Sequence, residues 1–301
     1  MENRSTVFSI IGGDLRSVAL SNLIAEDKYK INVFGFNNRD FSMKFLDKDN
    51  LNSAISGSRI IIGPTPCSSD NETLNSPYYE NKIFLQDIFK LMTKNQIFIA
   101  GKITDQISGI AKFYNIKIFD ILKREEMSVL NSIPTAEGAI QIAMEKMQIT
   151  LHNCNALVLG YGRIGKILSK MLFGIGSNVY VLSRKYSDMA WIRGYGYHPL
   201  TILELPNSIS KMNVIFNTIP FLFLKEDFLN KMDKNSLIID LASIPGGVDF
   251  EKAKELGIET VWALSLPGKV APITSAKFIK DTIYNIIREE GILIWVLLDL
   301  K

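Results

Sequence analysis

The strongest chemical signal in the sequence is a Gly-x-Gly-x-x-Gly motif that follows a β-rich run and opens a helical pattern. In such a motif Gly160 allows a tight turn, Gly162 lets the backbone approach a pyrophosphate, and Gly165 allows close packing of helix on strand. The first helical residues, Arg163 and Ile164, offer free N–H groups and the positive end of the helix dipole to phosphates. The motif predicts dinucleotide binding; the alternative is a purely structural glycine turn.

The residues that end the next β-rich run indicate the type of dinucleotide. An NAD-binding protein usually has Asp or Glu at this point, which binds the ribose hydroxyls. Here the run ends in Ser183, Arg184 and Lys185, and the first acid is Asp188. Two cations and a hydroxyl suit a 2′-phosphate. We therefore predict NADP, with NAD as the alternative cofactor, although the segment could also be a solvated basic turn.

Two later turns follow strands of the same half. Asn217, Thr218 and Pro220 are predicted to line the nicotinamide ribose, because the carboxyl ends of parallel strands face the ligand crevice. A plain turn is the alternative. The segment 243–247 occupies the same kind of edge one strand later, with the same two interpretations.

A second group of polar residues follows the first strand of the N-terminal half. A Gly-Gly pair precedes Asp14 and Arg16, which imitates a nucleotide-binding loop without its third glycine. These groups suit a small anion; equally, Asp14 could cap the next helix and Arg16 could be a surface charge. Thr65, in a Gly-Pro-Thr-Pro turn, either faces the crevice or belongs to a rigid loop.

Three further candidates lie near the expected domain junction. Glu137, near a predicted helix start, is either an acid or base of a closing cleft or a favourable partner of the helix dipole. Lys269, in a predicted loop over 266–275, is a candidate partner for a substrate carboxylate. Thr274 is expected only to cap the final helix.

The rarer reactive residues exclude several chemistries. The chain has two histidines and two cysteines, which argues against a zinc site or a disulfide framework. No histidine follows His198, so the general acid and base of a 2-hydroxy acid dehydrogenase is missing. No Gly-x-Ser-x-Gly elbow supports a serine hydrolase.

Short β-rich runs alternate with helical patterns in both halves, which predicts βαβ units and parallel sheets covered by helices. The fold class expected is α/β, with two doubly wound, Rossmann-like domains of mainly parallel sheets. A linking helix joins them, and a C-terminal helix returns to the first domain. The runs are 7–11, 31–34, 59–62, 97–100 and 116–119, then 156–159, 178–182, 213–217, 237–241 and 260–263.

Helix signals set the predicted boundaries. Pro134 is expected at the start of the linking helix, where its missing N–H costs nothing, and a final helix is expected over 275–288. The predicted domains are 1–132 for the substrate and 133–275 for NAD(P), with 276–301 as a helix and apolar tail on the first domain. Segments 68–79 and 186–199 are expected to be loops.

Composition favours an ordinary globular protein. Of 301 residues, 47% are hydrophobic and 22% charged, and the net charge of +3 is not gathered in a basic block that would indicate nucleic acid binding. The N-terminus lacks a signal-peptide pattern, and the apolar stretch 292–298 is too short to cross a bilayer. We expect a cytoplasmic, metal-free oligomer without membrane or nucleic acid partners.

Five segments, in order along nearly the whole chain, resemble the family of dipicolinate synthase A-type subunits from spore-forming bacteria. They are 11–16, 63–66, 131–139, the glycine motif at 160–165, and 266–272. The segment around Pro134-Thr135-Ala136-Glu137-Gly138 is more specific than the glycine motif, which many unrelated proteins share.

The resemblance implies an NAD(P)-dependent oxidoreductase. With a flavoprotein-like B-type subunit, it would oxidise dihydrodipicolinate from the lysine pathway to dipicolinate in the mother cell during sporulation. On this view Arg16 and Lys269 meet the two substrate carboxylates, and Asp14 or Glu137 accepts the proton. Two alternatives stay open: an NADP-binding scaffold or sensor without catalysis, and a dehydrogenase of another small amino or keto acid.

Overall fold

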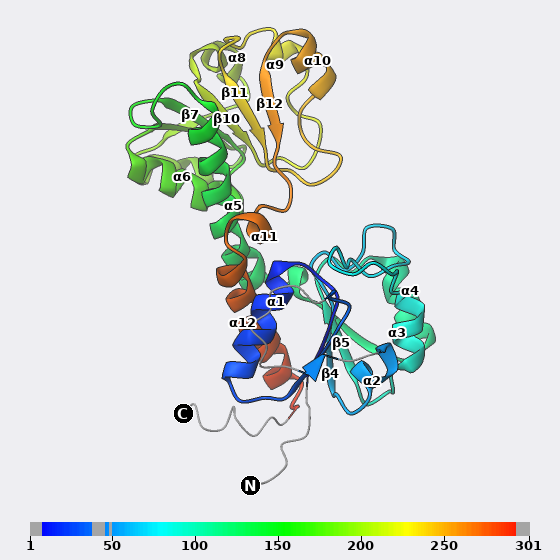
Figure 1. The fold of residues 1–301 in the computed structure, drawn as a ribbon. Helices are drawn as coiled ribbons and strands as arrows, with labels where there is room; N and C mark the ends of the chain where they lie inside the picture. The colour runs from blue at the N-terminus through cyan, green and yellow to red at the C-terminus, as the bar shows by residue number, and fades with distance from the viewer. Residues whose placement is uncertain (1–7, 38–45, 48–49, 293–301) are drawn as a thin grey trace. The chain divides into compact units, whose positions relative to one another are not determined.

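The computed structural model of the chain describes residues 8–37, 46–47 and 50–292. It divides into two compact units, one of 1–128 with 271–301 and one of 129–270. Each unit is an α/β layer structure around a six-stranded parallel sheet (Figure 1). The predicted fold class, two Rossmann-like domains with parallel sheets, is confirmed.

The first unit carries the sheet order β3-β2-β1-β4-β5-β6. Strands β1, β2, β4 and β5 are buried along their whole length, as expected for parallel strands between helical layers. The elements are β1 (Phe8–Ile11), α1 (Leu15–Glu26), β2 (Ile31–Phe34), β3 (Leu46–Asp47), α2 (Leu51–Ile55), β4 (Ile60–Ile62), α3 (Leu85–Leu91), β5 (Ile97–Ala100), α4 (Asp105–Phe113), β6 (Lys117–Asp120), the 3₁₀ turn η1 (Ile121–Lys123) and α12 (Pro272–Glu289).

The C-terminal helix returns to this first unit, as predicted. Helices α1 and α12 lie side by side on one face of the sheet (Figure 1), while α2, α3 and α4 cover the other face. Ile279 and Ile283 of α12 are buried beside Phe8 of β1. The predicted packing of the apolar tail concerns residues 293–301, which lie outside the described part of the chain.

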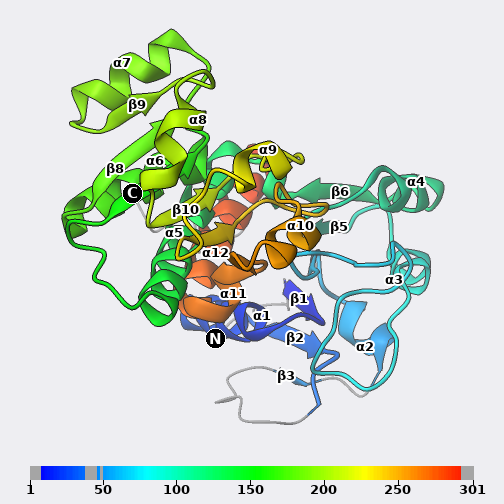
Figure 2. The same cartoon turned by 90° about the horizontal axis from the view of Figure 1, so that it is seen from above.

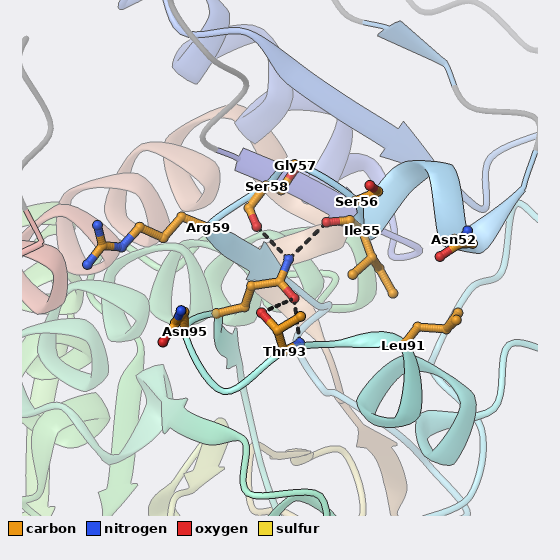
Figure 3. Close-up of a pocket in the computed structure, with 10 residues that line it drawn as sticks. Asn52, Ile55, Ser56, Gly57, Ser58, Arg59, Leu91, Thr93 and Asn95 are labelled. Carbon is orange, nitrogen blue, oxygen red and sulfur yellow. Dashed lines mark hydrogen bonds between the residues drawn. The ribbon is translucent and has the colours of Figure 1, made fainter.

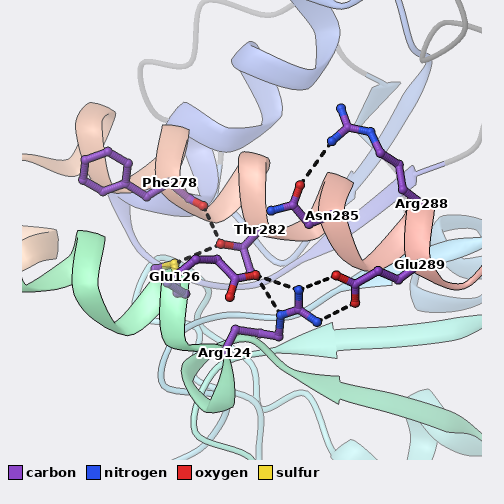
Figure 4. A network of polar contacts seen from close by, with 8 residues as sticks. Arg124, Glu126, Phe278, Thr282, Asn285, Arg288 and Glu289 are labelled. Carbon is purple, nitrogen blue, oxygen red and sulfur yellow. Dashed lines mark hydrogen bonds and ion pairs between the residues drawn. The ribbon is translucent and has the colours of Figure 1, made fainter.

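Polar contacts in the middle and at the C-terminal end of α12 add to this apolar packing. The carboxylate of Asp27 accepts hydrogen bonds from Tyr284 Oη at 2.7 Å and Lys280 Nζ at 2.9 Å. Arg124 lies between Glu126 and Glu289 and donates to both Glu289 oxygens at 2.6 and 2.7 Å (Figure 4). Hydrogen bonds from Arg124 lower the pKa of both glutamates. The helix is therefore fixed at several points along its length.

The second unit has the order β12-β11-β10-β7-β8-β9. Helices α5, α6 and α7 cover one face of its sheet, and α8, α9 and α10 the other. The elements are α5 (Glu125–Lys146), which begins in the first unit, then β7 (Asn155–Leu159), α6 (Arg163–Ile175), β8 (Asn178–Leu182), α7 (Tyr186–Gly194), β9 (His198–Leu200), α8 (Leu205–Ser208), η2 (Ile209–Lys211), β10 (Val214–Asn217), α9 (Glu226–Leu229), β11 (Leu237–Asp240), α10 (Phe250–Glu255), β12 (Glu259–Trp262) and α11 (Leu266–Val270).

The predicted start of the linking helix is wrong. Helix α5 begins at Glu125, so Pro134 lies inside it and Glu137 is in its second half. An internal Pro134 leaves the carbonyl of Leu130 without its N–H partner, and the next carbonyl, Asn131 O, accepts from Thr135 Oγ1 at 2.8 Å. Two acidic residues in the first turn mark the true start. Glu137 therefore does not interact with the dipole of a helix start.

Two predicted loops contain regular structure. Segment 186–199 forms helix α7 and the start of edge strand β9 (Figure 2), because Ile192 and Tyr197 are buried and anchor both elements to the sheet. Segment 266–275 contains α11 and the start of α12, whose N-cap is Ala271. Thr274 is thus not the cap, since Pro272 already occupies the first turn. Segment 68–79 is irregular, as predicted.

Candidate functional site

The glycine motif forms a strand–turn–helix loop in the second unit. Gly160 follows β7 with a φ of +99°, a conformation that favours glycine. A Cβ on Gly165 would lie 2.1 Å from the carbonyl oxygen of Gly160, so only glycine fits there. A Cβ on Gly162, the N-cap of α6, would meet no atom within 4 Å. The turn is closed behind the helix N-terminus and open in front of it, which fits a bound pyrophosphate.

This loop lies at the topological switch point of the sheet. Strand β7 has β8 on one side and β10 on the other, and the chain proceeds outward in both directions. Such points open a crevice at the carboxyl ends of the strands. Thr218, directly after β10, donates to the carbonyl of Leu159 through its backbone N–H at 3.0 Å and its hydroxyl at 2.8 Å. The structure therefore brings Thr218 against the glycine loop.

Asn217 has a different environment from its neighbour. Its side chain is fully buried, and its amide donates to Ile219 O at 3.1 Å and to Asp240 Oδ1 at 2.8 Å. Its oxygen accepts from Ile219 N at 3.1 Å. The side chain organises the turn after β10, while Pro220 is exposed on that turn. Contact of either residue with a ribose stays a prediction.

The end of β8 holds a contact that the sequence pattern does not indicate. Ser183 is buried and donates from its hydroxyl to Asp188 Oδ2 at 3.2 Å. Arg184 and Lys185 are exposed beside it. Helix α7, which lies where a loop was expected, is what returns a carboxylate to this strand end. Both cations and a carboxylate therefore surround the place where a dinucleotide ribose would bind.

Tyr161, inside the glycine motif, is a residue that the motif itself does not single out. It is 8% exposed, and Lys166 Nζ lies 5.5 Å from its ring centroid. Burial, with smaller contributions from Tyr197, Tyr195 and Asp188, raises the pKa of its phenol to about 12. Tyr161 is therefore a neutral aromatic wall of the loop and no base near neutral pH.

The first unit has a corresponding switch point between β1 and β4. After β1 the chain turns through a Gly-Gly pair, and Asp14 caps α1 by accepting from Arg16 N at 2.9 Å. The Arg16 side chain, 7% exposed, pairs with Asp14 at 2.7 Å and also donates to the carbonyl of Thr65. The two candidates thus bind each other and tie the loop after β1 to the loop after β4.

This geometry shows the environment of each residue, and their binding of a substrate stays a prediction. The capping role of Asp14 is observed, and Arg16 is a buried cation and not a surface charge. The Thr65 side chain is partly buried and packs on Gly101, where a Cβ would lie 2.4 Å from its Oγ1. The switch point therefore contains a fixed guanidinium, the feature expected of a carboxylate-binding site.

Glu137 and Lys269 are carried by two helices of the second unit that pack on each other. Both side chains are exposed. Helix α5 contacts α11 at Gly138, where a Cβ would lie 2.9 Å from Val270 and 3.1 Å from Leu266. This glycine lets the two helices approach closely, so a carboxylate and an ammonium are carried on adjacent helices. Asp14, Arg16 and Thr65 belong to the other unit.

One hollow in the first unit is not a candidate site. It has a volume of about 610 Å³ and lies at the amino ends of β4 and β5, the edge opposite the switch point (Figure 3). Gln96, one of its buried polar residues, donates to the carbonyls of Ile55 and Ser58 and accepts from Thr93 N. Its carboxamide is already occupied by the protein and does not recruit a ligand.

A buried cysteine thiol and the metal-ligating residue types are further candidates for functional groups. Burial and the nearby Asp120 raise the pKa of the Cys67 thiol to about 12, so it is no nucleophile. Among the described residues no cluster of His, Cys, Asp or Glu could hold a metal ion. None of the described helices is long and apolar enough to span a membrane.

Comparison with known proteins identifies relatives over nearly the full length. Residues 7–122 match the family model of the N-terminal domain of the dipicolinate synthase A-type subunit. The chain is 29% identical over 284 residues to the dipicolinate synthase A-type subunit of Bacillus subtilis (strain 168), covering 93% of this chain and 95% of that protein. The resemblance predicted from the sequence is confirmed.

Solved structures lead to the same group. The crystal structure of the dipicolinate synthase A-type subunit from Bacillus halodurans matches with a TM-score of 0.87 and 27% identity, covering 94% of this chain and 97% of that one. The Bacillus subtilis structure matches with a TM-score of 0.85 and 28% identity, covering 95% and 96%. L-alanine dehydrogenase, at a TM-score of 0.64 and 14% identity over 94% of this chain and 90% of that one, shares the fold.

Proposed function

Because the chain resembles the dipicolinate synthase A-type subunits over nearly its whole length, we propose that it is the nicotinamide-dependent subunit of a dipicolinate synthase. It oxidises dihydrodipicolinate to dipicolinate together with a B-type subunit. The observation that carries the proposal is the glycine loop, closed behind Gly165 and open in front of Gly162 at a switch point. Unit 129–270 accordingly binds the cofactor, and both units contribute proposed substrate contacts.

The cofactor is proposed to be NADP. Gly160, Gly162 and Gly165, with the N–H groups of Arg163 and Ile164, hold the pyrophosphate. The exposed cations Arg184 and Lys185 bind the 2′-phosphate beside the buried Ser183. Asp188 is the group that opposes this choice, because its carboxylate favours ribose hydroxyls and repels a phosphate.

The reaction removes a hydride and a proton from the dihydropyridine ring, which becomes aromatic. The cofactor, when bound, supplies the hydride acceptor. The chain positions the substrate, which carries two carboxylates, for this step. Arg16 is the primary carboxylate partner, since it is buried and held rigid by Asp14. Lys269 is proposed for the second carboxylate and Thr65 for the edge of the site.

Glu137 is the better of the two proposed proton acceptors. Both carboxylate oxygens of Asp14 already accept hydrogen bonds from the Arg16 side chain. Glu137 is exposed on α5. We therefore assign the proton transfer to Glu137, on the cofactor-binding unit, and the positioning of Arg16 to Asp14.

The proposed cellular setting comes from the same family. We propose a complex with a B-type subunit of dipicolinate synthase, an oligomeric assembly and a cytoplasmic place in the mother cell of a sporulating bacterium. The reaction would then branch from the lysine pathway.

The test is a turnover experiment. The purified chain, with and without its B-type partner, is mixed with dihydrodipicolinate formed in situ and with NADP⁺ or NAD⁺, against a blank without enzyme. Equal amounts of dipicolinate and NADPH above the blank support the proposal, and Arg16→Ala should raise the substrate KM at least tenfold. If dipicolinate forms only at the rate of the blank while NADP⁺ binds, the chain is instead a non-catalytic scaffold. Reduction of NADP⁺ or NAD⁺ with a different amino or keto acid as substrate would show that the chain is another dehydrogenase.

A further inference from the structure

A buried carboxylate in the second unit has no role in the functions described so far. Asp240, the last residue of β11, is fully buried. Its Oδ1 accepts from Asn217 Nδ2 at 2.8 Å and from Ala242 N at 3.0 Å, and its Oδ2 accepts from Gly247 N at 2.7 Å. Within the described residues no Lys or Arg forms an ion pair with it. Three N–H donors therefore hold this buried carboxylate in one orientation, and their hydrogen bonds offset the cost of burying it.

These bonds join two loops that face the same crevice. Asp240 and Asn217 are register partners at the ends of neighbouring strands. Loop 218–224 follows β10 and loop 241–248 follows β11. Gly247 O accepts from the N–H groups of Phe223 and Leu224, both at 2.9 Å. A Cβ on Gly247 would lie 2.1 Å from Asn217 Nδ2 and 2.6 Å from Ile219 O, so the two loops are packed without spare room.

The same network reaches the glycine loop. Asn217 binds both backbone groups of Ile219, which fixes the adjacent Thr218, and Thr218 binds the carbonyl of Leu159 directly before Gly160. A chain of hydrogen bonds thus runs from Asp240 to the turn that begins the glycine motif. It passes along β10, the half of the sheet that takes the second mononucleotide of a dinucleotide in this topology.

We infer that Asp240 is a positioning residue which, through Asn217, fixes the loop that receives the nicotinamide half of the cofactor. The inference rests on the proposed binding of a dinucleotide. It assigns the glycine loop to the pyrophosphate and adenosine, and the Asp240 network to the remaining half. The two assignments predict different effects on binding. Disturbing the network should weaken the binding of the whole dinucleotide and leave the binding of its adenosine diphosphate ribose fragment unchanged.

Asp240→Asn is the direct test, because an amide cannot accept all three N–H donors. Gly247→Ala disturbs the same loops from the other side with Asp240 unchanged, and keeps the test decisive if Asp240→Asn does not fold. Asp249→Asn is the matched control: the Asp249 side chain caps α10 by accepting from Lys252 N at 3.0 Å, and its backbone N–H, which the exchange leaves in place, donates to Leu224 O at 3.0 Å. Each variant is checked by circular dichroism and studied well below its Tm.

Binding of NADP⁺, NAD⁺ and adenosine diphosphate ribose is measured by calorimetry, which needs no turnover. The expected result for Asp240→Asn and Gly247→Ala is at least a tenfold rise in the Kd of the tighter dinucleotide, with the fragment Kd within twofold of wild type. The control should change neither value. An equal rise in the Kd of dinucleotide and fragment, or no rise in either Kd, would overturn the inference. Absence of dinucleotide binding by the wild-type chain would instead refute the proposed function on which it rests.

Discussion

Gly162→Ala tests whether this glycine is required by a bound ligand or by the fold. A Cβ at this position has nothing within 4 Å in the protein, and the φ of −82° is open to alanine. Exchange at a helix N-cap costs about 0.5–1 kcal/mol. For a unit of this size that corresponds to a fall in Tm of about 1–4 °C. The unliganded protein should therefore remain folded and nearly as stable as wild type.

Cofactor binding should respond much more strongly to this change. The methyl group would occupy the space through which a pyrophosphate approaches the N-terminus of α6, and would cost at least one hydrogen bond to a charged oxygen. Such a bond is worth about 1.5–3 kcal/mol, which corresponds to a rise in Kd of about 10- to 150-fold. Calorimetric titration with NADP⁺ measures this value, and thermal unfolding without ligand measures the stability.

A matched control lies in the same helix. Gly174, near the end of α6, also has open space around its Cβ position. Gly174→Ala should raise stability by about 0.5–1 kcal/mol through helix propensity and leave the Kd unchanged. If Gly162→Ala binds the dinucleotide within twofold of wild type, the assignment of the loop to a pyrophosphate is wrong.

Three further predictions concern specificity and stability. Arg184→Gln with Lys185→Gln should raise the Kd of NADP⁺ about tenfold and leave that of NAD⁺ unchanged, as competitive titration would show. Tyr284→Phe removes the hydrogen bond to Asp27 and should lower the unfolding free energy by about 1 kcal/mol in urea denaturation; an unchanged midpoint would contradict this. Hydrogen bonds from Arg124 lower the pKa of its two glutamate partners below 4.5, so their contribution is complete above that pH and lost as pH falls through the lowered values. Arg124→Gln should therefore lose less stability than wild type between pH 6 and 3, measured by thermal unfolding.

The regular parts of the fold follow from local patterns. Strands such as β2 and β8 occur where the apolar runs predict them, because parallel strands buried on both faces need continuous apolar sequence. Helix α7 was missed because Gly194 and Gly196 suggest a loop, whereas the burial of Ile192 is a tertiary effect. The start of α5 was placed too late because Pro134 is tolerated inside the helix.

The candidate site likewise contains features that local sequence predicts and contacts that depend on tertiary packing. The glycine motif could be identified from spacing, since each glycine answers a local steric demand. The contacts of Asp188 with Ser183 and of Asp240 with Asn217 could not, because each joins residues through the tertiary packing of separate elements. Whether Arg16 was buried or a surface charge likewise depended on the approach of Thr65 from a distant strand.

Titration of the wild-type chain with NADP⁺ and NAD⁺ tests the proposed dinucleotide site most directly. We predict one dinucleotide bound per chain, with NADP⁺ the tighter of the two, and a rise in its Kd of about 10- to 150-fold in Gly162→Ala. Absence of binding by either dinucleotide at millimolar concentration, or binding that Gly162→Ala leaves intact, would contradict the assignment of the glycine loop to a dinucleotide.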